Sequence, residues 1–283
     1  MSICAADLRT EVFLKRVSIG DAELYTETHG TGEDLLLVAG LGGSGTFWQA
    51  QVAVLAESYR VTLFDHRGVG RSSAAPLVST SEQLADDLLK LMDVLGIEQA
   101  HLVGHSTGGA IGQHLALRAP ERLRSLVLSS SWAGPTPLFI ELFKLRRDVL
   151  INSGIENYLL LGAVLASPAW HLHEKFTSRE DFLGGRTRAL NRMDVELGRL
   201  NAVMTHDLRH RLAEIRVPTA VMCARDDQIT AAPMSLELAE LIPEALLRVL
   251  PEGGHFCPQT NTEQYNAALL ELLQALNAGT DNA

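Results

Sequence analysis

Short apolar runs alternate with helical patterns along the first half of the chain, and this alternation restricts the fold more than any other feature. The runs lie at residues 35–39, 61–64, 101–103 and 126–128. Runs of this kind are typical of strands that are buried on both faces. Between the second and third runs, leucines recur at helical spacing over residues 84–95, and Thr80 with Gln83 resembles a capping box. Together these patterns predict a mostly parallel sheet flanked by helices.

The pattern changes after Trp132. Residues 133–214 contain helical stretches and many charges, with no convincing strand. Two further strand-like segments open the chain, at residues 12–17 and 22–28. Strand signals return late in the chain at residues 219–223 and 246–250, and helix signals at residues 235–241 and 265–276. We therefore predict one α/β core domain, built from residues 1–132 and 215–283. A helical cap, or lid, over residues 133–214 interrupts it.

Composition excludes several classes of function. The 283 residues include 24 Lys and Arg against 34 Asp and Glu, a net charge of −10. This balance disfavours binding to nucleic acid or to an anionic membrane surface, since both need a basic face. Hydrophobic residues make up 46% and charged residues 20%, which suits a globular protein rather than a disordered one. Three scattered cysteines, no signal-peptide pattern and no apolar run of ~20 residues predict a cytoplasmic protein.

A candidate nucleophile follows the third apolar run. Residues 104–108 read Gly-His-Ser-Thr-Gly and match G-x-S-x-G, which is a weak pattern alone because short Gly/Ser strings are common. Here it joins a buried strand to a helix at residues 110–119, the strand–turn–helix setting that a nucleophile elbow requires. We predict that Ser106 occupies this strained turn and that small flanking residues let the strand and helix pass closely.

A serine hydroxyl needs a base, and the base needs a carboxylate that orients it. In a fold of this kind the chain order is serine, then acid, then histidine. His255 follows the strand at residues 246–250 on a loop, so we predict that it is the base. Asp226 and Asp227 both follow the strand at residues 219–223, and position alone does not separate them.

The reaction also requires backbone donors for a developing oxyanion. The amide of Thr107, directly after the candidate nucleophile, is one expected donor. The glycine-rich loop at residues 40–45 supplies the other, for which we expect the amide of Leu41. A phosphate-binding loop is the competing interpretation, but the G-K-[ST] sequence is absent and the spacing does not match G-x-G-x-x-G.

These motifs, taken in order, resemble the α/β-hydrolase superfamily. They are the elbow at residues 104–109, Asp65-His66-Arg67-Gly68-Val69-Gly70-Arg71-Ser72, Arg225-Asp226-Asp227-Gln228-Ile229-Thr230 and Gly253-Gly254-His255. The resemblance implies Asp227 as the triad acid, because relatives carry that Asp two residues before a Val/Ile–Thr/Pro pair. It also implies a structural role for residues 65–72. Where many relatives have His-Gly after the first core strand, this chain has Ala39-Gly40, with little expected loss because a backbone amide does the work.

A closer resemblance concerns residues 39–48, which look like the pyrimidine-utilisation aminoacrylate hydrolase group. Residues 223–227 and 253–255 fit that group too, and the enol-lactonases of aromatic catabolism are also similar. The elbow position is not always serine in the aminoacrylate group. Ser106 is present here, which favours ordinary serine hydrolysis.

Substrate-binding residues are less clear from the sequence. We expect the cap to cover Ser106 and name Trp132 and Trp170 as candidate pocket residues. Arg188, Arg192 and Arg199 fall at helical spacings that could hold a substrate carboxylate, although a solvated helix face is the favoured interpretation. We expect no metal, since the histidine pairs of the cap have no acidic or cysteine partner pattern.

The sequence thus predicts a cofactor-free serine hydrolase that cleaves a small ester, lactone, amide or carbamate through an acyl-enzyme. Alternatives on the same triad are carbon–carbon bond hydrolysis, perhydrolysis, or ligand reception on a hydrolase scaffold. The expected partner is a small-molecule substrate, with no nucleic acid and no membrane. A homodimer is one option for assembly.

Overall fold

A computed structural model describes residues 12–73, 76–184 and 192–280 of the chain. In this part an eight-stranded sheet has the order β1-β2-β4-β3-β5-β6-β7-β8. The strands are β1 (Val12–Ser18), β2 (Glu23–His29), β3 (Glu33–Val38), β4 (Tyr59–Phe64), β5 (Ala100–His105), β6 (Leu123–Ser129), β7 (Thr219–Ala224) and β8 (Leu246–Leu250). All the strands that the apolar runs predict are present, and the structure confirms the mostly parallel sheet.

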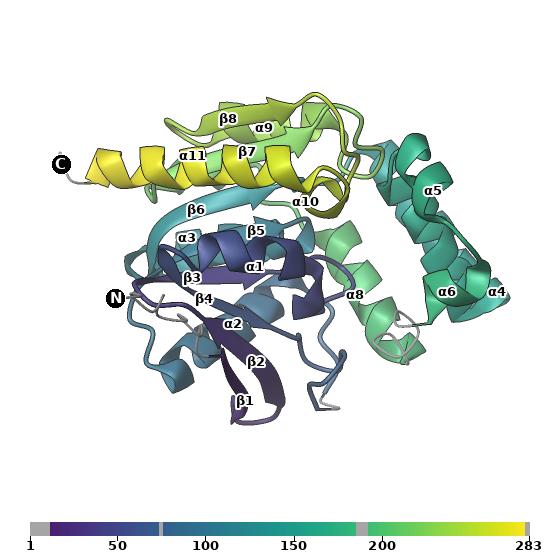
Figure 1. Ribbon diagram of the computed structural model, residues 1–283, viewed down its shortest axis with the longest axis horizontal. Coiled ribbons are helices and arrows are strands. Elements are labelled where there is room, and N and C mark those ends of the chain that lie inside the picture. Colours follow the sequence, from purple (N-terminus) through teal and green to yellow (C-terminus); the bar gives the residue numbers. More distant parts are fainter. Residues whose placement is uncertain (1–11, 74–75, 185–191, 281–283) are drawn as a thin grey trace, which may run out of the picture.

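The sheet is antiparallel at one edge only. Strands β1 and β2 pair antiparallel, as do β2 and β4, and every later neighbouring pair is parallel. The central strands are fully buried because helices cover both faces, which explains why their sequences show no polar alternation. The carboxyl ends of the parallel strands point toward the cap (Figure 1).

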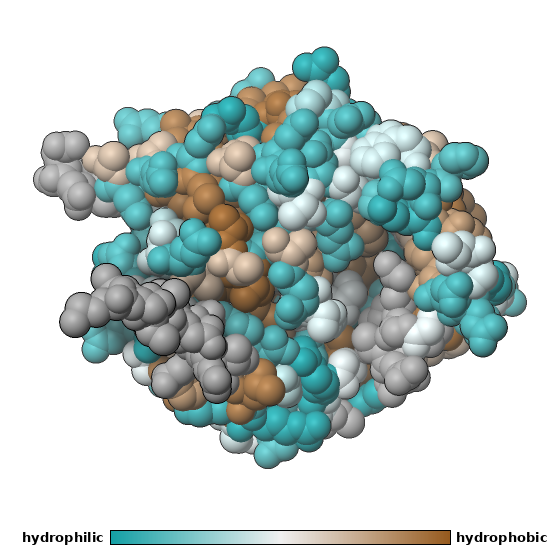
Figure 2. Space-filling view, viewed as in Figure 1, coloured by the Kyte–Doolittle hydropathy of each residue, from teal (hydrophilic) through white to brown (hydrophobic). Residues whose placement is uncertain are grey.

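Helices cover the sheet on both faces. One face packs on α2 (Ser81–Leu95), α3 (Thr107–Arg118) and α9 (Ala232–Leu241), whose buried residues join one hydrophobic cluster. The other packs on α1 (Gln49–Leu55) and α11 (Thr262–Thr280), through a second cluster. Apolar surface is visible in the seam between α1 and α11, on a face that is otherwise mostly hydrophilic (Figure 2). Short helices complete the core: η1 (Gly45–Trp48), η2 (Pro120–Arg122), η3 (Leu212–Glu214) and α10 (Cys257–Thr260).

The described part of the inserted segment is helical. We call its helices the cap: α4 (Pro137–Ala166), α5 (Ala169–Lys175), α6 (Arg179–Leu183) and α8 (Met193–Thr205). Helix α8 lies between the core and the other cap helices (Figure 1). Leu208 and Leu212 pack into a core cluster rather than with the cap. The last residues of the predicted insertion, after α8, therefore belong to the core.

Helix α4 departs from one sequence expectation. By length and composition it is long and apolar enough to cross a membrane, although we expected no such stretch. Its backbone is interrupted at Gly154, where φ is 80° and ψ is 172°. Each of the two pieces is shorter than the ~20 residues that a spanning helix needs. One face of the helix packs in the cap's hydrophobic cluster through Phe139, Phe143 and Leu150.

Candidate active site

Ser106 lies at the sharp turn between β5 and α3. Its φ of 54° and ψ of −117° are strained for a residue with a side chain. The turn can close because the residues two positions before and after the serine are glycines. A Cβ on Gly104 would lie 2.3 Å from the carbonyl oxygen of Gly108, and a Cβ on Gly108 would lie 2.1 Å from the carbonyl oxygen of Val38. The elbow that the motif predicts is thus present. It presents Ser106 at the carboxyl end of the sheet, at the N-terminus of a twelve-residue helix.

The imidazole of His255 is held by Asp227. Its Nδ1 donates to Asp227 Oδ2 at 2.8 Å, and both side chains are almost fully buried. The Asp227 carboxylate also accepts bonds from the amides of Ile229 and Thr230 and from the Thr230 hydroxyl. Asp226 instead accepts the amide of Gly254, at 2.8 Å. The geometry therefore selects Asp227 as the partner of His255, as the resemblance implies.

Ser106 and His255 line the same cavity. Between these two described residues no hydrogen bond joins the hydroxyl to the ring, and such bonds are often long in unliganded enzymes. His105 packs against His255 with 4.8 Å between ring centroids. Burial lowers the pKa of His105 well below its usual value, so its ring stays neutral beside the candidate base.

The expected oxyanion donors lie next to Ser106. A Cβ on Gly40 would come within 3.0 Å of Ser106 Cβ, so the loop that carries Leu41 passes directly beside the serine. Within the described part of the chain, neither the Leu41 amide nor the Thr107 amide has an acceptor. Free N–H groups from two different segments at one serine are what an oxyanion requires.

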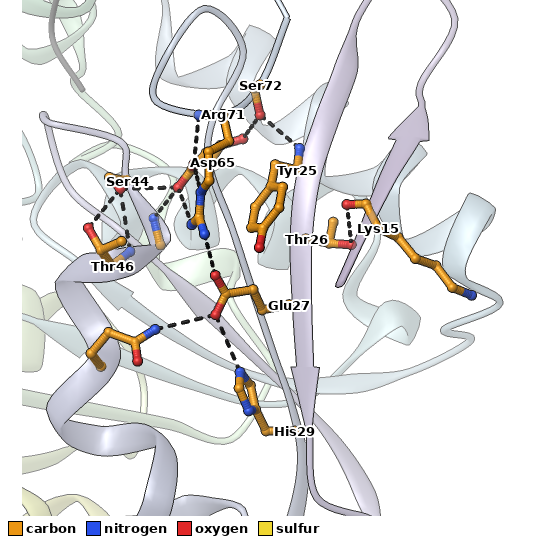
Figure 3. Close-up of polar contacts among 12 residues, drawn as sticks. Lys15, Tyr25, Thr26, Glu27, His29, Ser44, Thr46, Asp65, Arg71 and Ser72 are labelled. Atoms are coloured by element: carbon orange, nitrogen blue, oxygen red, sulfur yellow. Dashed lines mark hydrogen bonds and ion pairs between the residues drawn. The ribbon is translucent and has the colours of Figure 1, made fainter. Parts of the chain in front are cut away.

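A buried carboxylate anchors the far half of this loop. Asp65 accepts hydrogen bonds from the Ser44 hydroxyl at 3.1 Å and the Gly45 amide at 2.8 Å (Figure 3). It also pairs with Arg71, whose guanidinium reaches on to Glu27 of β2. These contacts give residues 65–72 a structural role, as the resemblance implies.

The cavity above Ser106 has a volume of about 540 Å³. This size suits a small ligand. Core residues line one side, and the cap supplies the other; the aromatic and aliphatic contributors include Phe47, Phe143, Leu159, Ile229 and Phe256. The polar contributors from the cap are Arg146, Tyr158 and Glu196.

The two tryptophans named from the sequence do not line this cavity, which corrects that expectation. Trp132 is fully buried and packs on Phe139 and His206 within the cap's hydrophobic cluster. Trp170 is 45% exposed on α5. Aromatic residue type was the only signal for either residue, and that signal does not distinguish a pocket wall from a packed interior or a surface.

Comparisons with known proteins agree with this architecture. Residues 35–152 match the family model described as alpha/beta hydrolase fold. A putative carbamate hydrolase RutD from Caulobacter sp. (strain K31) is 39% identical over 256 residues, covering 88% of this chain and 95% of the relative. The chain belongs to the α/β-hydrolase superfamily. A second putative carbamate hydrolase RutD, from Azorhizobium caulinodans, is 36% identical over 89% of this hydrolase and 95% of that protein.

Solved structures add to the comparison. A hydrolase from Pseudomonas aeruginosa PA01 superposes with a TM-score of 0.81 at 29% identity, covering 95% of this hydrolase and 99% of that chain. The enol-lactonase from Burkholderia xenovorans LB400 gives a TM-score of 0.83 at 24% identity, over 92% and 100% of the two chains. The second likeness, at this low identity, concerns the fold.

The cap of this hydrolase places a buried polar cluster in the cavity wall, which the sequence did not reveal. Arg146 on α4 donates to the Tyr158 hydroxyl at 3.3 Å, and that hydroxyl donates to Glu196 Oε1 on α8. Arg146 Nε and Glu196 Oε2 are buried without a partner among the described residues. Burial raises the pKa of Glu196, although Arg199 and Arg146 lie near enough to oppose the shift.

The three cap arginines of the sequence analysis have different positions. Arg192 is partly exposed and pairs with Asp194, as a solvated face predicts. Arg188 lies outside the described residues. Arg199 is 1% exposed and donates to the backbone of the glycine-rich loop, which corrects the expected solvated position. The cause is packing: α8 lies directly against the core, so the inward face of this polar helix is buried.

Proposed function

We propose that this protein is a cofactor-free serine hydrolase that works through an acyl-enzyme. Ser106 is the nucleophile, His255 the general base and then the general acid, and Asp227 the group that fixes the imidazole orientation. The amides of Leu41 and Thr107 hold the oxyanion. The observation that carries the proposal is the buried His255–Asp227 hydrogen bond opening onto the same cavity as a strained Ser106.

The steps follow from this placement. His255 takes the proton from the Ser106 hydroxyl as the oxygen attacks the substrate carbonyl. The tetrahedral intermediate expels the alcohol or amine, which receives that proton from His255. Water, deprotonated by the same imidazole, then attacks the acyl carbonyl and releases the acid and free Ser106. The negative charge of Asp227 stabilises each transient imidazolium, and the hydrogen bonds from residues 229 and 230 hold the carboxylate in place.

The substrate we propose is a small ester, lactone, amide or carbamate. A cavity of about 540 Å³ supports a small molecule. The relatives named as putative carbamate hydrolases favour a carbamate or a similar C–N bond. The guanidinium of Arg146 in the cavity wall supports an acceptor on the substrate, such as a carboxylate. This polar end separates the proposed substrate from a purely apolar ester.

The test is turnover combined with active-site labelling. Wild-type protein should hydrolyse p-nitrophenyl acetate and small carbamates, and a fluorophosphonate should label it. Ser106→Ala should lose both the turnover and the label while melting at the wild-type temperature. Ser44→Ala is the matched control, because Ser44 also lines the cavity. This variant should still be labelled. Labelling or turnover that survives in Ser106→Ala would refute the mechanism.

A further inference from the structure

Arg199 connects the cap to the loop that carries one oxyanion donor. From α8 its guanidinium donates to the carbonyl oxygen of Gly40 through Nη2, at 2.8 Å, and to that of Leu41 through Nε. Its Nη1 lies 3.3 Å from His66 Nδ1. All three contacts are with core residues, while Arg199 itself does not line the cavity. Its hydrogen bonds beside Ser106 are therefore made to the loop backbone.

The loop is shaped around this side chain. Gly43 has a φ of 65°, and a Cβ there would lie 2.9 Å from the guanidinium of Arg199. The Gly43 amide also donates to Gly40 O, at 2.9 Å, so this carbonyl accepts two hydrogen bonds. The second half of the loop has its own anchor in Asp65. Arg199 is thus the anchor of the first half only, beside Ser106.

The bonded carbonyl belongs to the same peptide unit as the candidate oxyanion donor. The Gly40 C=O and the Leu41 N–H share one planar peptide group, on opposite sides of it. A cation bound at the oxygen draws electron density from the nitrogen and makes its N–H a stronger donor, because hydrogen bonds in a chain polarise one another. The same contact fixes the direction in which the N–H points.

The charge of Arg199 is not cancelled by a direct ion pair. Among the described residues it makes no ion pair with a carboxylate, and Glu196, one turn earlier on α8, acts on it at longer range. Burial lowers the pKa of Arg199. A guanidinium that only tethered the cap would be held equally well by a carboxylate. Here its positive charge is directed at two backbone carbonyls beside Ser106.

We propose that Arg199 is a positioning residue that orients and polarises the Gly40–Leu41 peptide, so that the cap completes the oxyanion hole of the core. This inference rests on the proposed serine-hydrolase function. It goes beyond that function because it assigns a part of transition-state stabilisation to a cap residue that does not touch the substrate.

The test compares Arg199→Met and Arg199→Lys with Arg209→Met. Arg209 is the matched control, because it also donates to two backbone carbonyls, those of Gly134 and Pro135, at the base of the cap. We expect Arg199→Met to lower kcat on the order of 10–100-fold, with KM changed less than about twofold. Arg199→Lys should fall between it and wild type, and Arg209→Met should keep the wild-type kcat.

A transition-state analogue separates this role from a structural one. A small alkylboronic acid, which forms a tetrahedral adduct on serine, should bind Arg199→Met more weakly by the same factor as the loss in kcat. Butyrate, a product-like ligand, should bind the wild-type protein and Arg199→Met with the same affinity. If Arg199→Met is unstable, Arg199→Ala assayed with and without millimolar guanidinium replaces it, and added guanidinium should restore kcat.

Two results would overturn the inference: equal loss of kcat in Arg199→Met and Arg209→Met, or unchanged boronic-acid affinity in the Arg199 variants. Failure of the proposed function looks different. In that case Ser106→Ala would keep its turnover, whatever the Arg199 variants do. An inactive Ser106→Ala together with a fully active Arg199→Met would refute the role of Arg199 alone.

Discussion

The core and the cap of this hydrolase both bury charged side chains, but they satisfy them differently. In the core, the buried guanidinium of Arg67 pairs with Asp87 through two hydrogen bonds and with Asp21 through two more. In the cap, Arg146 and Glu196 each keep a buried polar atom without a partner among the described residues. Removing one partner of a paired buried charge destabilises the fold, whereas a buried polar atom without a partner already costs stability. Arg146 and Glu196 also line the cavity, where their side chains can meet a ligand.

The largest expected effect lies in the core, at the acid of the proposed triad. Asp227→Asn keeps the shape of the side chain but removes the charge that fixes the His255 tautomer, so kcat should fall by about 10⁴-fold. Asp226→Asn is the control, since Asp226 accepts the Gly254 amide and no other donor among the described residues, and an asparagine oxygen can replace it there. Its kcat should stay within about tenfold of wild type. Equal losses in steady-state kinetics would contradict the assignment of the acid.

The second prediction concerns the paired charges directly. Arg67→Met should destabilise the protein by about 3–5 kcal/mol, because Asp87 would remain buried without its cation. The loss is measured by urea unfolding. At temperatures where the variant is folded, its kcat should equal that of wild type, since Arg67 does not line the cavity.

Arg146→Met is the counterpart in the cap and should show the opposite pattern. Its stability should change by about 1 kcal/mol or less, because Glu196 can take up a proton. KM for a carboxylate-bearing ester should rise about 10–100-fold, while KM for neutral p-nitrophenyl acetate should not. A similar stability loss in the Arg67 and Arg146 variants would remove the contrast between core and cap.

The sequence predicts the core better than it predicts the cap. Strands β3 to β7 are recognisable because they are buried on both faces, so local hydrophobicity reports their structure directly. The proposed triad is recognisable because a serine elbow and a Gly-Gly-His loop leave local signatures. Thr80 and Gln83 do cap α2, although the Gln83 side chain binds the amide of Ser79.

The polar wall of the cap has no such signature. Arg146, Tyr158 and Glu196 come together only because two pieces of α4 fold back at Gly154 and pack against α8. In the sequence, charged residues at helical spacing on the cap look like a solvated face. For the same reason the pattern predicts an exposed Arg199, and residue type alone does not place Trp132 or Trp170. Contacts between distant helices, rather than local pattern, decide these positions.

The fourth prediction tests the junction of the two regions by pH. His206 follows α8, and its ring nitrogens lie 3.0 Å from Ser81 Oγ of α2 and 3.2 Å from Gln113 Oε1 of α3. Burial lowers its pKa from 6.5 to about 3. In the unfolded chain His206 takes up a proton below about pH 6.5, but in the native state it stays neutral. Its stabilising contribution is therefore present above pH 6.5 and is lost as the pH falls toward 3.

The measurement is unfolding free energy between about pH 6 and pH 4. His206 should contribute a slope of about 1.4 kcal/mol per pH unit, and His206→Gln should lower the total slope by that amount. Ser81→Ala removes a hydrogen bond but keeps the imidazole, so it should lower stability and retain most of the slope. A slope that His206→Gln leaves unchanged would exclude His206 as its source.

The smallest expected effect is the loss of stability when the hydroxyl of a buried tyrosine is removed, compared between the cap and the core. Tyr158 donates to the Glu196 carboxylate in the cap, whereas Tyr265 donates to the Ser129 hydroxyl in the core, at 3.0 Å. Removing the Tyr158 hydroxyl raises the already raised pKa of Glu196 further, because the ionised carboxylate loses a donor. With a raised folded pKa, stability is fully present below pH 4.5 and is lost as pH rises. Tyr158→Phe should thus cost about 1 kcal/mol at pH 4.5, where the carboxyl is neutral and Arg146 loses its acceptor, and about 1 kcal/mol more at pH 8. Tyr265→Phe should cost about 1 kcal/mol at both, since its partner is neutral. Urea unfolding at the two pH values distinguishes the variants, and a pH-independent loss in Tyr158→Phe would show that Glu196 is not an ionised acceptor in the cap.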